Sequence, residues 1–136
     1  MLIKHDEIHI NSHENIEIIN ITNKILKIIQ KQGLEEGLIN ISTKHTTSSI
    51  MINEDEDGLK KDYINFLEKI VPNDNYYHDK IDDNAKSHLK SMLTTPTQTL
   101  PVINRKISLG TWQSIFFVEF DGPRRNRTIH ITLIGD

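Results

Sequence analysis

Residues 112–120, WQSIFFVEF, form a strongly apolar strand pattern, and a second such pattern, TIHITLI, follows at 128–134. Aromatic and β-branched residues are typical of strands, and alternation places Glu119 on the same face as Phe117. The turn sequence Asp-Gly-Pro separates the two patterns, which indicates a closing hairpin of antiparallel strands.

Working back along the chain, further strand patterns appear. Residues 97–103 (TQTLPVI) and 106–110 (KISLG) are separated by a short turn, and Leu38–Thr43 leads into the motif HTTSSIMINE at 45–54. Ile50–Ile52 continue as strand. Near the N-terminus Ile8 and Ile10 alternate with polar residues, which favours a strand with one solvated face.

Three segments have helical spacing. Ile21–Ile29 is expected to begin at Asn20 or Thr22 and to stop at Gly33. Leu59–Ile70 is expected to end before Pro72, with Asn53 as its N-cap and Glu56 completing a capping box. A short helix is predicted at Asn84–Leu93. Strands outnumber helices, so the sequence predicts an α+β domain of mostly antiparallel, sandwich-like sheets with two or three packed helices.

Length and composition exclude several classes of protein. The 136 residues, 1–136, suit a single domain, and a formal charge of −3 leaves no basic surface of the kind that nucleic-acid binding requires. The chain has no cysteine, which excludes thiolate metal sites and fits a reducing compartment. The N-terminal residues lack the apolar core of a signal peptide, so we expect a cytoplasmic protein without membrane contact.

His45, His78 and His88 are the histidines placed at element boundaries or in polar loops. Three histidines with an open fourth position are typical of catalytic zinc. Asn84 and His88 share one helix face, and neighbouring aspartates could orient a ligating imidazole. Their spacing matches no metal motif, however, so the residues alone favour scattered, solvated histidines over a metal site. His5, His9 and His13 lie too far apart along a strand to bind one ion.

Other polar residues are candidates for the same chemistry. Glu54 and Glu119 could act as general bases, and Gln113 follows the only Trp in the motif GTWQ. Arg124, Arg125 and Arg127 could bind phosphate oxygens, although a charged turn is a simpler explanation. Structural alternatives are helix-dipole compensation for the acids at 54–57 and a solvated strand face for Glu119.

These motifs together resemble the YjbQ-like family, also called the secondary thiamine-phosphate synthase family. The resemblance rests on HTTSSIMINE at 45–54, YYH at 76–78, DDNAKSHLK at 82–90, LGTWQSIFFVEFDGPR at 109–124 and TIHITLIGD at 128–136, and so covers essentially the whole chain. Two departures are Asp55 and Asp83, where the family often has Asn and Gly.

The resemblance implies a homotrimer with sites near the subunit contacts and a divalent metal, zinc, on His45, His78 and His88. It assigns Glu54, Glu119 and Gln113 to catalysis. Substrate-binding positions would be Thr46, Thr47, Ser48, Asn53, Asn84, Asp121 and Arg124. The implied reaction joins a pyrimidine pyrophosphate to a thiazole phosphate, so the partner would be a small phosphorylated molecule.

Two alternatives to this reaction stay open. One is a zinc-dependent hydrolase of a small phosphorylated or acyl substrate, because pyrophosphate departure is normally assisted by magnesium and a three-histidine site suits zinc. The other is a non-catalytic protein that binds a small ligand. The density of titratable groups in the motifs favours catalysis.

Overall fold

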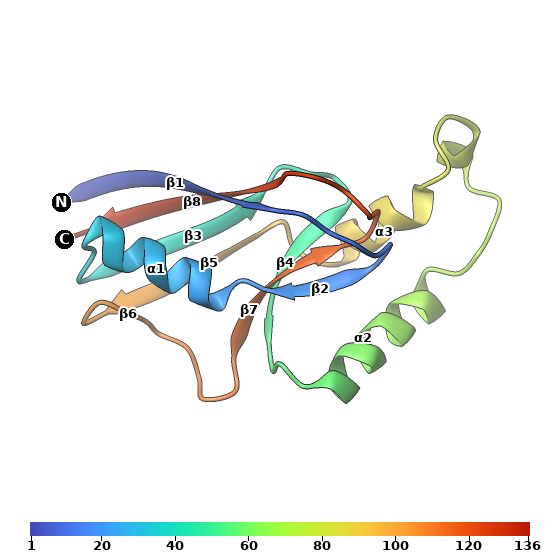
Figure 1. Ribbon diagram of the computed structural model, residues 1–136. Coiled ribbons are helices and arrows are strands. Elements are labelled where there is room, and N and C mark those ends of the chain that lie inside the picture. Colours follow the sequence, from blue (N-terminus) through green and yellow to red (C-terminus); the bar gives the residue numbers. More distant parts are fainter.

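The computed structural model describes all residues, 1–136, and contains two antiparallel sheets (Figure 1). The large sheet has the strand order β1-β8-β3-β5-β6, with bounds Leu2–Ile10, Arg127–Gly135, Gly37–Thr43, Thr97–Ile103 and Lys106–Ile107. The small sheet has the order β2-β7-β4, with bounds Glu17–Asn20, Ser114–Glu119 and Ser48–Asn53. The predicted α+β class is confirmed.

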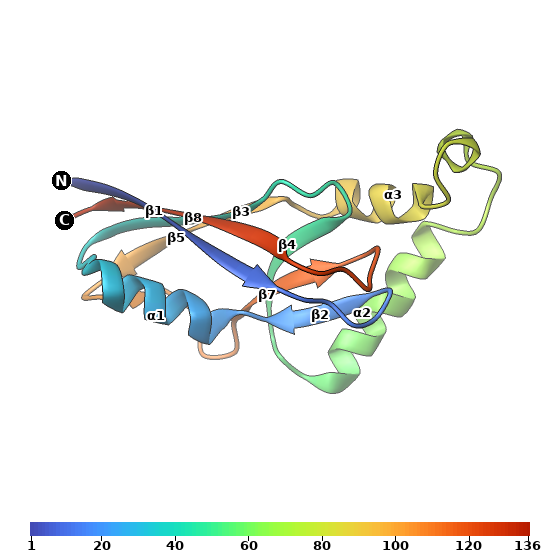
Figure 2. The same cartoon turned by 45° about the horizontal axis from the view of Figure 1, so that its top comes forward.

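Three α-helices and one short 3-10 helix complete the chain. They are α1 (Thr22–Gln32), α2 (Asp57–Ile70), η1 (Tyr77–Lys80) and α3 (Ala85–Leu93). Figure 2 shows α1 beside the large sheet, whereas α2 and α3 lie toward the end of the molecule that carries η1. None of the helices combines the length and the apolar character needed to cross a bilayer.

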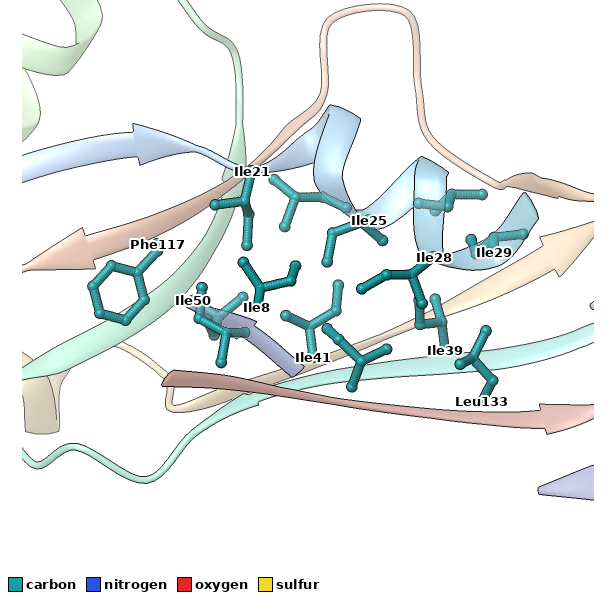
Figure 3. Close-up of a cluster of buried hydrophobic side chains, with 14 of the residues drawn as sticks. Ile8, Ile21, Ile25, Ile28, Ile29, Ile39, Ile41, Ile50, Phe117 and Leu133 are labelled. Carbon is teal, nitrogen blue, oxygen red and sulfur yellow. The ribbon is translucent and has the colours of Figure 1, made fainter. Parts of the chain in front are cut away.

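The main core lies between the large sheet, α1 and one face of the small sheet (Figure 3). The large sheet contributes every second residue of its strands to this core, because alternate residues of a strand face the same side. Ile129, Ile131 and Leu133 of β8 are buried, and Ile39 and Ile41 of β3 join them. Helix α1 contributes Ile25, Ile28 and Ile29 at helical spacing.

The small sheet is buried on both faces. Ile115 and Phe117 of β7 join the main core, while Phe116, Val118 and Phe120 pack with Leu67 of α2 in a second cluster. This burial explains the continuous apolar run, which one solvated face would have interrupted. Glu119 shares the inward face of Phe117, as alternation predicts, and is fully buried.

The predicted hairpin between residues 112–120 and 128–134 is wrong, because β7 and β8 belong to different sheets. Residues 120–126 carry the chain from one sheet to the other. Gly122 makes this crossing possible, since a Cβ there would lie 2.0 Å from the backbone oxygen of Glu14. Residues 97–103 and 106–107 do form the predicted hairpin.

Helix boundaries follow the sequence with one correction. Gly33 ends α1 in a left-handed conformation, with φ of 70°. Helix α2 is capped by Glu56, whose carboxylate accepts from the N–H groups of Gly58 and Leu59, and not by Asn53. The side chain of Asn53 instead accepts from the N–H of Glu54 at 2.8 Å, which keeps it at the end of β4.

Candidate active site

The loop 44–47 leaves the large sheet at the end of β3, and it carries the first predicted site residue. Backbone pairing between β3 and β8 stops at Thr43, which lies opposite Ile129. The N–H of Thr128 then donates to Nε2 of His45 at 3.0 Å. The imidazole therefore takes the place of the missing strand acceptor. Burial, followed by the nearby charge of Arg127, lowers the pKa of His45.

Hydroxyl groups of the two residues that flank this loop, Thr43 and Ser48, hold it together. Thr43 Oγ1 and Ser48 Oγ lie 2.9 Å apart, and Ser48 Oγ donates to the backbone oxygen of His45 at 3.3 Å. Thr47 and Ser48 are buried, whereas Thr46 is exposed. Of the three predicted substrate-binding hydroxyls, Thr46 alone is open to solvent, and the other two stabilise the loop.

Glu119 and Arg127 form a buried ion pair beneath the loop. Arg127 donates from Nε to Oε1 at 2.8 Å and from Nη2 to Oε2 at 2.5 Å. Ser12 Oγ and the N–H of Asp121 also donate to this carboxylate, at 2.7 and 3.1 Å. Arg127 Nη2 further donates to Thr47 Oγ1 at 2.9 Å. The pair thus joins both sheets to the loop.

This environment argues against the predicted role of Glu119 as a general base. Burial alone would raise the pKa of its carboxyl, but the hydrogen bonds from Arg127, Ser12 and the Asp121 N–H outweigh burial and lower it. A carboxylate that accepts four hydrogen bonds has no free oxygen directed at a substrate. Arg127, predicted as a phosphate ligand, is likewise occupied.

A second set of side chains extends from the same corner to η1 and α3. Arg124 Nη2 lies 2.8 Å from Asp121 Oδ2, and Asn84 Nδ2 donates to the same oxygen at 2.8 Å. Asn84 Oδ1 is 3.0 Å from Nε2 of His78. The His78 and His88 rings meet edge to face, with centroids 4.7 Å apart. We call this chain of contacts, from Arg124 through Asp121 and Asn84 to His78, the relay.

The relay fixes the chemistry of His78. Because the Asn84 amide nitrogen donates to a carboxylate, its oxygen faces His78 and accepts from Nε2–H. In the neutral ring the lone pair then belongs to Nδ1. The sequence brought Asn84, Asp121 and Arg124 together as substrate ligands, whereas the structure makes them the partners that orient an imidazole.

Three hollows surround these residues. A cavity of about 490 Å³ at the start of α3 is lined mainly by polar residues, including Asp79, Asn84 and Asp121. A mainly apolar hollow of about 340 Å³ contains His78 and His88 together with Tyr77 and Met92. A third, of about 650 Å³, is lined by Asn11, Ser12, His13, Pro123, Arg124 and Arg125 and has no acidic residue. We call this third one the basic hollow.

The remaining predicted residues lie elsewhere. Asn53 pairs with Ser114 at one end of the small sheet, and Ser48 pairs with Glu119 at the other. Five residue steps at about 3.3 Å each separate these ends by roughly 17 Å. Glu54 and Gln113 belong to the Asn53 end, and Gln113 Oε1 accepts from the N–H of Gly110 at 2.8 Å. Within one copy of the chain they do not join the relay.

The predicted three-histidine metal site is not assembled within one copy of the chain. No three of the His, Asp and Glu side chains are arranged to hold one ion. His78 and His88 are adjacent, but His45 is held by Thr128 through Nε2. The single chain therefore brings together only two of the three histidines that the resemblance implies as zinc ligands.

Sequence reasoning missed Ser12 and placed His13 on one strand with His5 and His9. The loop between β1 and β2 brings both Ser12 and His13 to this corner. Ser12 Oγ donates to Glu119 and accepts from the N–H of Arg124 at 2.9 Å. The sequence did contain a signal for the ion pair. Arg127 lies two residues before Ile129 and four before Ile131, so strand alternation places its side chain on the same inward face as these two isoleucines.

Comparison with known proteins supports the motif-based resemblance. The family model described as UPF0047 protein YjbQ-like matches residues 6–136. A UPF0047 protein of Methanothermobacter thermautotrophicus is 44% identical over 130 residues, which cover 95% of this chain and 90% of that protein. The YugU protein of Bacillus subtilis is 35% identical, with 94% and 97% of the two chains covered.

A solved structure agrees with these relatives. The crystal structure of a YbjQ-like protein of unknown function from Sulfolobus solfataricus P2 superposes with a TM-score of 0.96 at 34% identity, and 99% of each chain is covered. A family match over nearly the whole chain, together with a relative that is 44% identical over 95% of it, is decisive for membership. The chain belongs to the UPF0047 YjbQ-like family.

Proposed function

We propose that this chain is an enzyme that acts on a small phosphorylated molecule, with His78 as the group that transfers a proton. The relay is the observation that carries the proposal. It leads from a guanidinium through a carboxylate and an amide to an imidazole, and each contact is 2.8–3.0 Å long. Such supporting hydrogen bonds fix the tautomer and orientation of a working histidine.

The basic hollow supports a phosphorylated substrate. Arg125 and His13 line it without an ion-pair partner, and Arg124 lines it while also holding Asp121. Guanidinium groups match phosphate oxygens in charge and geometry. A phosphate bound there would lie next to Arg124, the first member of the relay, whose last member is His78.

The first reaction to test is the one that the resemblance names. In thiamine-phosphate synthesis the thiazole nitrogen forms a bond to the methylene carbon of the pyrimidine. The bond between that carbon and an oxygen of pyrophosphate breaks, and pyrophosphate leaves. Cationic groups that face the departing pyrophosphate stabilise the charge that develops on it. Arg125 and His13 are suited to that role, and Asp121 and Asn84 would hold His78 in its orientation.

Hydrolysis is the second candidate, and the tautomer of His78 favours it. A free Nδ1 lone pair can take a proton from water as water attacks a phosphoryl or acyl group. Zinc bound by His78 and His88 would use that same nitrogen, so a metal-bound His78 and a basic His78 are alternatives. Metal analysis of wild type and of a His78→Ala, His88→Ala double variant, purified without chelator, separates them, because equal zinc contents would exclude the metal.

We further propose that copies of the chain assemble around the hollow of His78 and His88. Tyr77 and Met92 line this hollow, yet their side chains are 88% and 77% exposed. Exposed apolar groups beside polar site residues mark surfaces that a partner covers. A neighbouring copy, in the homotrimer that the resemblance implies, could also bring Glu54 and Gln113 to this site. Met92→Lys should lower the assembly state in light scattering; an unchanged mass would contradict the proposal.

One set of assays tests the activity. Purified protein is given the two thiamine precursors and, separately, a panel of small phosphate and acyl esters. We expect His78→Ala to abolish the turnover that wild type shows, and Arg125→Ala to raise KM for phosphorylated substrates. Arg105→Ala is the matched control, because Arg105 is exposed, pairs with Glu35 and does not line the basic hollow. If the protein bound phosphate but turned over none of these substrates, it would be a non-catalytic binding protein and the proposal would be overturned.

A further inference from the structure

We infer that His45 presents an Nδ1–H donor to an oxygen atom of the substrate and is not a metal ligand. The three-histidine assignment requires a free lone pair on His45. In the structure that lone pair is already used, because Nε2 accepts the backbone N–H of Thr128 at 3.0 Å. A nitrogen that accepts a hydrogen bond carries no proton, so in the neutral ring the proton is on Nδ1.

The geometry leaves His45 little freedom to change partner. Strand β3 ends at Thr43, so no strand residue can accept from Thr128 in place of the imidazole. A ring turned by half a rotation would place a carbon atom against this N–H and leave a backbone donor unpaired, which is costly in a folded protein. Binding a metal through Nε2 would break the same hydrogen bond.

The surroundings hold the ring in this orientation. Arg127 precedes Thr128 in β8 and donates a hydrogen bond to Thr47, which lies in the same loop as His45. Arg127 is in turn held by its ion pair with Glu119. The buried guanidinium also opposes a second positive charge on the imidazole. The lowered pKa of His45 agrees with this, with burial as its largest cause. His45 is half-buried, and the one hydrogen bond that its ring makes to the protein uses Nε2, so Nδ1–H remains for a ligand.

His45 and His78 then have opposite roles. His78 donates through Nε2–H to Asn84 and keeps a lone pair on Nδ1, whereas His45 keeps a proton on Nδ1. A neutral imidazole that donates to a carbonyl or phosphoryl oxygen stabilises negative charge developing there. The substrate contact rests on the proposed function. The tautomer of His45 does not, and it can be measured without any turnover.

The decisive measurement is a two-bond proton–nitrogen correlation spectrum of the full-length protein labelled with 15N-histidine. It is recorded at about pH 8, where an ordinary histidine is neutral. The His45 signals are identified by their loss in His45→Gln. We expect the Nδ1–H pattern for His45 and no shift of its signals when zinc is added. A protonated Nε2, or a His45 nitrogen shifted by zinc, would overturn the inference.

Two substitutions provide a second readout. Gln can accept from Thr128 and still offer an amide donor, but it is a poor zinc ligand, whereas Glu can accept and ligate but has no donor. If His45 is a donor, zinc affinity of His45→Gln stays within about twofold of wild type, and kcat/KM falls less for Gln than for Glu. A loss of zinc affinity beyond about tenfold in His45→Gln would show that His45 is a ligand.

Discussion

Glu119 of β7 and Arg127 of β8 form an ion pair in which Arg127 Nη2 lies 2.5 Å from Glu119 Oε2, and both side chains are buried. This contact is the point at which the two sheets and the loop of His45 are joined. A buried charge that loses its partner is costly. We expect Glu119→Gln or Arg127→Ala to lower the free energy of unfolding by about 3–5 kcal/mol, measured by denaturant unfolding.

The exposed pair of Arg105 and Glu35 is the control for this prediction. Breaking it with Arg105→Ala should cost at most about 1 kcal/mol, because water screens both charges. Equal losses for Arg127→Ala and Arg105→Ala would mean that burial of the Glu119 pair adds nothing to stability.

The same pair gives stability a defined dependence on pH. The pKa of Glu119 is lower in the folded protein than in the unfolded chain, so the unfolded chain binds the proton more tightly. Its contribution is therefore complete above about pH 4.3, the ordinary pKa of Glu, and is lost as pH falls through the folded-state value. Unfolding free energies of wild type and Glu119→Gln should converge as the pH is lowered. A constant gap would contradict this.

The relay can be tested at Asn84. In Asn84→Asp the side chain can still accept from His78, but it no longer donates to Asp121 and the two carboxylates repel each other, which displaces the acceptor that orients His78. We expect kcat/KM to fall by about 10–100-fold, mainly through kcat. Asn75→Asp is the matched control, since Asn75 is exposed in the loop before η1. Equal activity of both variants would remove the relay from the mechanism.

Gly122 should tolerate no side chain. A Cβ there would lie 2.0 Å from the backbone oxygen of Glu14, and backbone atoms must move to accept it. Gly122→Ala is expected to cost about 1–3 kcal/mol of unfolding free energy and to displace the neighbouring Asp121. Gly110→Ala, where the nearest atom is 3.4 Å away, should change stability by no more than about 0.5 kcal/mol. Similar melting temperatures for the two variants would refute the close approach.

Tyr63 carries a hydroxyl that is buried without a hydrogen-bond partner. Burial also raises its pKa to about 12, so the hydroxyl stays protonated at neutral pH. Removing an unpaired buried group relieves its desolvation cost, and Tyr63→Phe should stabilise the protein by about 1 kcal/mol. Tyr76→Phe, which loses a 2.5 Å hydrogen bond to the Pro72 oxygen, should destabilise it by a similar amount. Destabilisation by Tyr63→Phe would contradict the prediction.

Much of the fold follows from local pattern, and the exceptions have physical causes. Alternation located β7, β8 and the inward face of Glu119, because period-2 burial is a property of each strand alone. Strand β2 was missed, since EIIN is short and runs directly into the helical spacing of α1. The false hairpin arose because a turn sequence marks a change of direction but does not say which sheet the next strand joins.

The site was predicted less completely than the fold. The motifs predicted Asn84, Asp121 and His78 as site residues. Their individual roles depend on contacts between segments that are far apart in the sequence, which the motifs do not contain. Arg127 was taken for a phosphate ligand because it follows a charged turn, whereas its inward position in β8 commits it to Glu119. The two ends of the small sheet likewise separate residues that neighbouring motifs had grouped together.

The two chain ends meet at the opposite end of the large sheet from η1 (Figure 1), where the N-terminal amine lies 3.0 Å from a carboxylate oxygen of Asp136. Ends this close can be joined by a short linker, and circular permutation is tolerated where new ends open in an exposed turn. The turn at Asn104 and Arg105 offers such a place, at the end of the β5–β6 pair away from α3 and η1 (Figure 1). Affinity tags or fluorescent fusions at residue 1 or residue 136 would likewise be attached at the end of the large sheet away from η1 (Figure 1).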